Sequence, residues 1–134
     1  LVNIGANSFR FESTLSGIPS LDGGLLANNL CYGAGSPSGT SLLSGVTVGF
    51  NGWYQASAGG LSSATDVTGT NPGFVDANSK NFSLTSSSPC IDKGTTLVGR
   101  PYSGLRPDLG AFEYGSATPT DLVPPAATTD LRTR

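Results

Sequence analysis

Hydrophobic residues come in short runs along this chain, and each run is bounded by turn-forming residues. No window of about 11 residues shows apolar positions at the i, i+3, i+4, i+7 spacing without an interrupting Gly or Pro. Short apolar runs between Gly, Asn, Ser and Pro are typical of β-strands. The pattern predicts strands over residues 1–4, 9–11, 25–32, 46–50, 53–55, 73–76, 82–85 and 109–114. It therefore predicts an all-β protein built from many short strands.

The segment 24–33 reads as an apolar strand, an Asn28-Asn29 bend, a second apolar strand and a Gly turn. This order fits one coil of a parallel β-helix, a fold in which similar coils stack on one another. Asn residues at the bends of such coils can form hydrogen-bonded ladders. A sandwich or barrel remains the alternative, because Asp22-Gly23 and Asn51-Gly52 are hairpin-turn pairs, although their flanking alternation is poor.

Three blocks in the C-terminal half carry a family resemblance. Residues 71–85 (NPGFVDANSKNFSLT) resemble a DPxFVDxxxxDFxL stretch, residues 87–94 (SSPCIDKG) a following GSPxIDxG, and residues 106–114 (RPDLGAFEY) a closing xxDIGAxEY. These stretches, in this order, belong to secreted right-handed parallel β-helix proteins of the pectate-lyase-like superfamily. Asn71 stands where Asp is more usual, and Cys90 where Ala is commoner. The resemblance implies a right-handed parallel β-helix whose C-terminal coils and cap this chain contains.

The expected organisation is β-helix coils over residues 1–70, a cap over 71–114 and a linker or extended tail over 115–134. Four prolines interrupt the cap, and Pro cannot donate to a strand ladder. Six apolar residues are expected to cover the open end of the stack, and three carboxylates beside turns are expected to accept backbone N–H bonds. The prolines are Pro72, Pro89, Pro101 and Pro107, the apolar residues Phe74, Phe82, Leu84, Ile91, Phe112 and Tyr114, and the acids Asp76, Asp92 and Asp108.

Composition narrows the function classes. The 134 residues carry a net charge of −2, only 12% are charged, and there is no His. A chain without His cannot build a Ser-His-Asp or Cys-His triad or a His-ligated zinc site. No basic field is present to hold a phosphate backbone, so nucleic-acid binding is not expected. No apolar run approaches the roughly 20 residues of a membrane span.

The compartment also follows from composition. Ser, Thr, Asn and Gly supply polarity in place of Lys and Glu, which suits a secreted or cell-surface protein, and we expect a bacterial one. Residues 123–132 resemble the opening of a fibronectin type III module, so we expect the polypeptide to continue, or the tail to dock on another subunit, with a simple disordered linker as the alternative. Cys31 and Cys90 can either pair, if the protein is extracellular, or act as separate buried thiols.

Candidate chemistry is sparse. The acids Asp66, Asp76, Asp92, Asp108 and Glu113 do not follow a calcium-loop spacing, so turn roles are favoured and neither Ca²⁺ nor another metal is assigned. Lyases of the superfamily use a Lys or Arg base. The cap offers only Lys80, Lys93, Arg100 and Arg106, which are expected to be solvated or paired, as Arg106 with Asp108. No residue is therefore assigned a catalytic role.

Aromatic residues near turns are the candidate carbohydrate contacts. Trp53, Tyr54 and Tyr102 are assigned this role, because exposed rings can stack on sugars, whereas core packing is the alternative for a single Trp. The resulting hypothesis is a non-catalytic C-terminal part of a secreted β-helix protein that binds or degrades polysaccharide. If the whole protein is an enzyme, the resemblance implies polysaccharide lyase-like activity. The alternative is a structural surface protein, such as an adhesin, sheath or extracellular fibre subunit, whose partners are neighbouring subunits.

Overall fold

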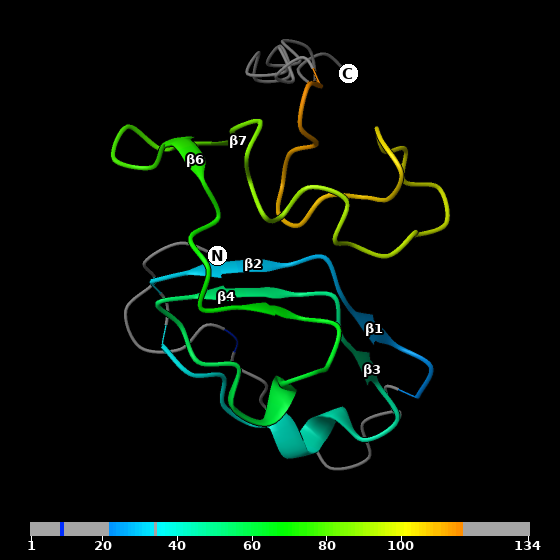
Figure 1. Ribbon diagram of the computed structural model, residues 1–134. Coiled ribbons are helices and arrows are strands. Elements are labelled where there is room, and N and C mark those ends of the chain that lie inside the picture. The colour runs from blue at the N-terminus through cyan, green and yellow to red at the C-terminus, as the bar shows by residue number, and fades with distance from the viewer. Residues whose placement is uncertain (1–8, 10–21, 34, 117–134) are drawn as a thin grey trace, which may run out of the picture.

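The structure is a computed structural model that describes residue 9 and residues 22–33 and 35–116 (Figure 1). Its elements are β1 (Leu25–Leu26), β2 (Leu30–Tyr32), the 3-10 helix η1 (Thr40–Leu43), β3 (Thr47–Val48), β4 (Gly52–Tyr54), the 3-10 helix η2 (Gly59–Leu61), β5 (Val67–Thr68), β6 (Phe74–Asp76) and β7 (Asn81–Leu84). The described residues contain strands and no α-helix, which confirms the all-β class.

The first five strands pair in parallel with a constant spacing. Leu25 faces Thr47 in the β1–β3 sheet, and Leu30 faces Gly52 in the β2–β4 pair, so partners lie 22 residues apart in both sheets. β5 then pairs with β4 and completes a sheet of order β2-β4-β5. Parallel partners need a long connection, and here it is a loop with a 3-10 turn. The segments 22–33 and 45–55 are therefore two repeats of one strand-bend-strand unit.

The bend in each unit has the same conformation. Asn28 lies between β1 and β2 with φ of 59°, and Phe50 lies between β3 and β4 with φ of 54°. Asn29 donates from its backbone N–H and its Nδ2 to Oδ1 of Asn51, at 3.1 and 3.0 Å. Asn51 is fully buried, and its Nδ2 donates to two backbone carbonyls of the bends. These bonds confirm the predicted asparagine contacts at the bends.

The three-stranded sheet separates two apolar cores. Cys31 and Trp53 are register partners and pack with Leu61 on one face, together with the partly buried Leu26 and Val48. Leu30 and Val67 face the other side, because they occupy the adjacent row of the register. The first face is the interior of the two repeats, and we call the second the outer face.

The C-terminal segment packs on this outer face. Leu84, Cys90 and Leu109 form one buried cluster with Leu30 of β2. Gly52 lies between Leu30 and Val67 in the register, and a Cβ there would lie 2.4 Å from Leu30 Cδ1. The glycine therefore leaves room for the side chains that seal the outer face. The sequence predicted that apolar residues of this segment cover the open end of a stack of coils. In the structure, the segment instead contacts the outer face of the β2-β4-β5 sheet.

Asn28 also fastens the C-terminal segment to the first bend. Its side chain accepts the Thr95 backbone N–H at 2.7 Å and donates to the Thr95 carbonyl at 2.8 Å. Its own carbonyl accepts the Gly110 N–H at 3.0 Å. One bend residue thus holds two parts of a segment that lies more than 60 positions further along the chain.

The remaining strands differ from the prediction in places. β6 and β7 form an antiparallel hairpin close to the predicted 73–76 and 82–85. The predicted strand 25–32 is interrupted by the Asn28 bend, and the short β5 was not predicted. The predicted strand 109–114 is wrong, because this stretch is a series of bends in which Asp108 Oδ2 accepts the Tyr114 N–H. Phe9 is not part of a strand, and residues 10–11 of that predicted strand lie outside the described residues, as do the strand predicted over residues 1–4 and the tail beyond residue 116.

Candidate functional site

Four half-buried aromatic rings form a continuous row. The ring centroids of Tyr54 and Tyr32 are 5.4 Å apart, those of Tyr32 and Phe74 are 5.4 Å apart, and those of Phe74 and Phe82 are 5.3 Å apart. All three spacings lie in the range of favourable aromatic pairs. We call these four residues the aromatic row.

Two structural units contribute to the row. Tyr32 and Tyr54 are register partners on β2 and β4, so the parallel pairing brings their rings together. Phe74 and Phe82 come from β6 and β7, and their rings meet edge to face. The row therefore joins the β2-β4-β5 sheet to the hairpin that begins the C-terminal segment.

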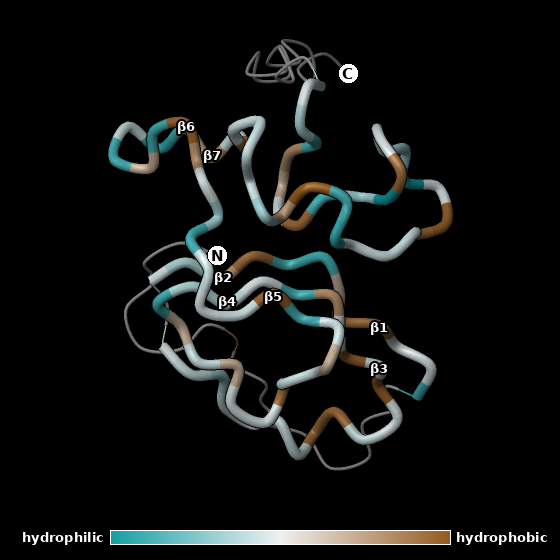
Figure 2. The backbone as a smooth tube through the Cα atoms, in the orientation of Figure 1, coloured by the Kyte–Doolittle hydropathy of each residue, from teal (hydrophilic) through white to brown (hydrophobic). Residues whose placement is uncertain are grey.

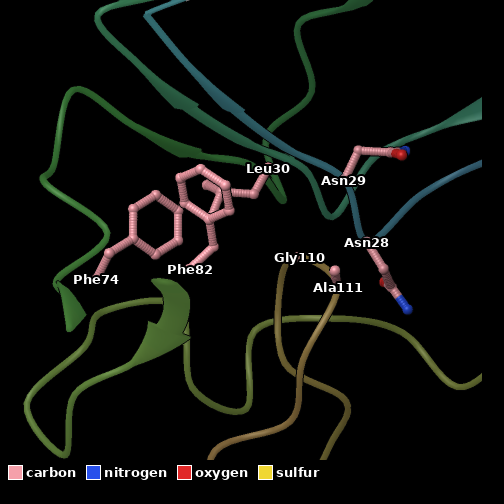
Figure 3. Close-up of a pocket in the computed structure, with 7 residues that line it drawn as sticks. All are labelled: Asn28, Asn29, Leu30, Phe74, Phe82, Gly110 and Ala111. Carbon is pink, nitrogen blue, oxygen red and sulfur yellow. The ribbon is translucent and has the colours of Figure 1, made fainter. Parts of the chain in front are cut away.

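A cavity of about 260 Å³ lies beside the row. Figure 3 shows the rings of Phe74 and Phe82 facing Leu30 at this cavity. The remaining lining residues are Asn28, Asn29, Gly110 and Ala111. The lining is uncharged, with aromatic rings at one end and amides with exposed backbone at the other. A cavity of this kind can take a sugar ring, which has apolar faces and polar edges.

A second cavity, of about 350 Å³, adjoins the first. Both are lined by Asn28, Gly110 and Ala111, so they share one wall. The second cavity is charged, because Arg100, Asp108 and Glu113 line it. The two cavities lie along the junction between the first bend and the C-terminal segment, and we refer to them together as the groove.

The carboxylates of the C-terminal segment are engaged with backbone N–H groups. Asp108 accepts from Asp92 at 2.7 Å and from Tyr114 at 2.6 Å. Asp92 Oδ1 accepts from Leu105 and Arg106 at 2.8 and 2.9 Å. Asp76 likewise accepts the Ser79 N–H, so the turn roles predicted for these three acids are confirmed.

The remaining two acids have similar roles. Asp66 Oδ1 accepts the Asn51 N–H, and its Oδ2 accepts the Trp53 indole N–H at 2.9 Å and the Ser63 N–H. Glu113 accepts backbone N–H bonds from Asp108 and Ser103. In the part of the chain that the structure describes, no three His, Cys, Asp or Glu side chains gather as metal ligands.

The three predicted carbohydrate contacts have different surroundings. Trp53 is only 2% exposed and packs in the interior core, so its ring offers no face to a ligand. Tyr54 belongs to the aromatic row. Tyr102 is 42% exposed on the loop between Lys93 and Arg106. The structure therefore brings Tyr54, but not Tyr102, together with other aromatic rings.

The two cysteines are free and buried in different clusters. They therefore fit the alternative of two separate thiols. Burial raises the pKa of the Cys31 thiol from 9.0 to about 11. Burial also raises the pKa of Cys90, partly offset by a hydrogen bond from Ser88. Neither thiol has the lowered pKa of a reactive nucleophile.

The expected pairing of Arg106 with Asp108 has a different outcome. The Arg106 guanidinium carbon lies 5.1 Å from the centroid of the Phe50 ring, a cation–π distance. The Asp108 oxygens are occupied by backbone N–H groups instead. The arginine therefore covers the strained bend residue Phe50 and helps to hold the C-terminal segment against the second repeat.

Sequence reasoning did not assign three members of the row as site residues: Tyr32, Phe74 and Phe82. A signal for Tyr32 was present, because Tyr32 and Tyr54 are separated by the same 22 positions as the paired strands. No comparable spacing points to Phe74 and Phe82, since they reach the row through the hairpin.

The described part of the chain contains no helix with the length and apolar character of a membrane span.

The chain was compared with protein-family models, curated proteins and solved structures, and none of them matches it.

Proposed function

We propose that this chain is the C-terminal part of a secreted right-handed parallel β-helix protein of the pectate-lyase-like kind. The support is the repeated strand-bend-strand unit, with parallel partners 22 residues apart and a left-handed residue at the same bend position of each repeat. The described stack contains two such units and the additional strand β5. The resemblance of residues 71–114 supports the same assignment.

The proposed function is polysaccharide binding at the cell surface or outside the cell, with the chain itself non-catalytic. The observation that carries this proposal is the aromatic row beside the groove. The rings follow one another at centroid spacings of 5.3 to 5.4 Å with interplanar angles of 40° to 69°, and successive sugar units would stack on the exposed parts of these tilted rings. The half-buried state of the four side chains leaves part of each ring accessible.

The groove would add polar contacts to this stacking. The Asn29 amide serves the bends, because its Nδ2 donates to the Ala27 carbonyl and to Asn51, so the polar contacts would come from the adjoining cavity. Arg100 in the adjoining cavity would place a cation near an acidic sugar unit. The proposed ligand is therefore a polysaccharide that bears carboxylates, with pectin, alginate and glycosaminoglycans as the probes.

The test is isothermal titration of the chain with oligosaccharides from these three polymers. Tyr54→Ala and Phe82→Ala are expected to weaken binding by about tenfold or more, equivalent to about 1.4 kcal/mol. Tyr114→Ala is the matched control, because this ring is 42% exposed and lies outside the row. The proposal fails if none of the probes binds the intact protein, or if the control loses as much affinity as the row variants.

A structural role is the second candidate, and the position of β5 favours it. β5 lies at the edge of the described three-stranded sheet, where it pairs with β4 alone. An edge strand can accept a strand from a neighbouring subunit, as fibre subunits do. Light scattering over a concentration series distinguishes the two, since a chain that remains a monomer counts against the fibre.

A further inference from the structure

The loop of residues 93–106 differs from every other surface segment that the structure describes. Figure 2 shows hydrophobic stretches along this loop, which lies on the side of the molecule away from the β6–β7 hairpin. Val98 is fully exposed, Leu105 is 86% exposed and Tyr102 is 42% exposed. Three large apolar side chains therefore project from one short surface segment.

The same loop carries most of the described positive charge. Lys93, Arg100 and Arg106 belong to it, and Lys80 is the one other basic residue in the described part of the chain. The loop itself contains no acid, in a chain whose net charge is −2. Lys93 and Arg100 form no ion pair with the described residues, and Arg106 lies over the Phe50 ring.

The acids near the loop lie at its base and face inward. Asp92 Oδ1 accepts the N–H groups of Leu105 and Arg106, so it closes the loop where the chain returns. Asp108 and Glu113 line the cavity beside Arg100, and their carboxylates also accept backbone N–H bonds. The acids thus shape the base, and the outer part of the loop presents apolar and basic side chains.

Both ends of the loop are anchored. Gly94 donates its N–H to the Pro107 carbonyl at 2.7 Å, and Thr95 is held on both sides by the Asn28 side chain. Arg100 donates its N–H to the Leu97 carbonyl, which makes a turn around Val98. A loop held in this way loses little conformational freedom when its tip binds a surface.

We propose that the 93–106 loop docks on an anionic lipid surface. Basic side chains are attracted to anionic lipid headgroups. Exposed aliphatic and aromatic side chains are stabilised when they enter the boundary between headgroups and acyl chains. A polyanionic sugar chain would satisfy the cations but offers no apolar region for Val98 and Leu105. The lipid surface therefore accounts for both features of the loop, and this inference does not depend on the aromatic row.

The test is co-sedimentation of the chain with sonicated vesicles of phosphatidylcholine and phosphatidylglycerol, compared with vesicles of phosphatidylcholine alone. The chain is expected to bind the anionic vesicles and to bind the neutral ones at least tenfold more weakly. Arg100→Gln is expected to weaken partitioning about fivefold. The double variant Val98→Ser, Leu105→Ser is expected to weaken it at least tenfold.

Val75→Ser and Lys80→Gln are the matched controls, since both residues are exposed and belong to the β6–β7 hairpin. Each should bind as the unchanged protein does. Trp53 fluorescence reports that every variant is folded, because this indole lies in the interior core. Equal binding of all variants, or no binding to anionic vesicles, overturns the proposal. It is also overturned if the double variant keeps its vesicle binding while alginate competes the protein off, which would assign the loop to a polysaccharide.

Discussion

The two regions of this protein satisfy their backbone by different means. In residues 22–69, strands pair in parallel and the bends are bridged by Asn29 and Asn51. After β7, the described chain has no strand, and carboxylates accept its N–H groups instead. The first region has two charged residues and residues 72–116 have eight. A segment without strand partners can thus be ordered by side-chain acceptors.

Substitution of one core residue in each region gives the largest expected effects. Trp53→Ala should lower the free energy of unfolding by about 3–5 kcal/mol, because it leaves a large cavity in the interior core of the first region. Leu109→Ala should cost about 2–5 kcal/mol and should release the C-terminal segment from the outer face. Urea unfolding measures both, and hydrogen exchange locates the change.

The comparison predicts that Leu109→Ala leaves the amides of β2 and β4 protected while those of residues 84–110 exchange faster. Uniform loss of protection in the Leu109 variant would show that the two regions unfold as one unit.

Asn51→Ala tests the bends, and its expected effect is smaller. The change removes an acceptor for the Asn29 N–H and a donor to two backbone carbonyls, of which the Gly49 carbonyl is buried, and this should cost about 2–4 kcal/mol. Asn71→Ala is the matched control, because its exposed side chain accepts one local N–H from Gly73. Thermal unfolding of both variants measures the difference, and equal losses would contradict a special role for the buried amide.

The interior core should also respond to alkaline pH. The raised pKa of Cys31 means that, between pH 9 and about 11, this thiol ionises in the unfolded chain but not in the folded one. The contribution of the neutral Cys31 thiol to the stability of the folded state is complete below pH 9 and is lost as the pH rises from 9 to about 11. Unfolding midpoints of the unchanged protein should therefore fall more steeply than those of Cys31→Ala. The same dependence of the unfolding midpoint on pH in both proteins would contradict a raised pKa for the Cys31 thiol.

Asp76 should give the smallest effect, in the C-terminal region. Hydrogen bonds from the Ser79 hydroxyl and backbone N–H hold the pKa of this carboxyl below its ordinary 3.8. The contribution of the ionised Asp76 to folding stability is present above pH 3.8, and it is lost as the pH falls through the lower pKa that Asp76 has in the folded protein. NMR titration of Asp76 should give a midpoint below 3.8 that moves toward this value in Ser79→Ala. An unchanged midpoint in that variant would show that Ser79 is not the cause.

Local pattern was enough to locate most strands and the turn acids. The apolar runs around Leu30 and Val48, the Asn-Asn bend and the Asp-containing turns depend on neighbours within a few residues, so their chemistry is readable in the sequence. The strand β5 was missed, because Val67 is a single apolar residue between Asp66 and Thr68 and so forms no apolar run. The predicted strand at 109–114 failed, because Leu109 and Gly110 bond to the distant Cys90 and Asn28.

The sequence by itself determined the all-β class, the low charge, which argues against nucleic-acid binding, and the lack of His, which excludes His-dependent triads. Only the tertiary structure decided that Trp53 is interior, that the C-terminal segment covers a sheet face, and that Tyr54 joins Tyr32, Phe74 and Phe82 in a row. The reason is physical: an apolar or aromatic side chain looks the same in the sequence whether it is buried or accessible. Its role is set by contacts with residues far along the chain, which local pattern does not encode.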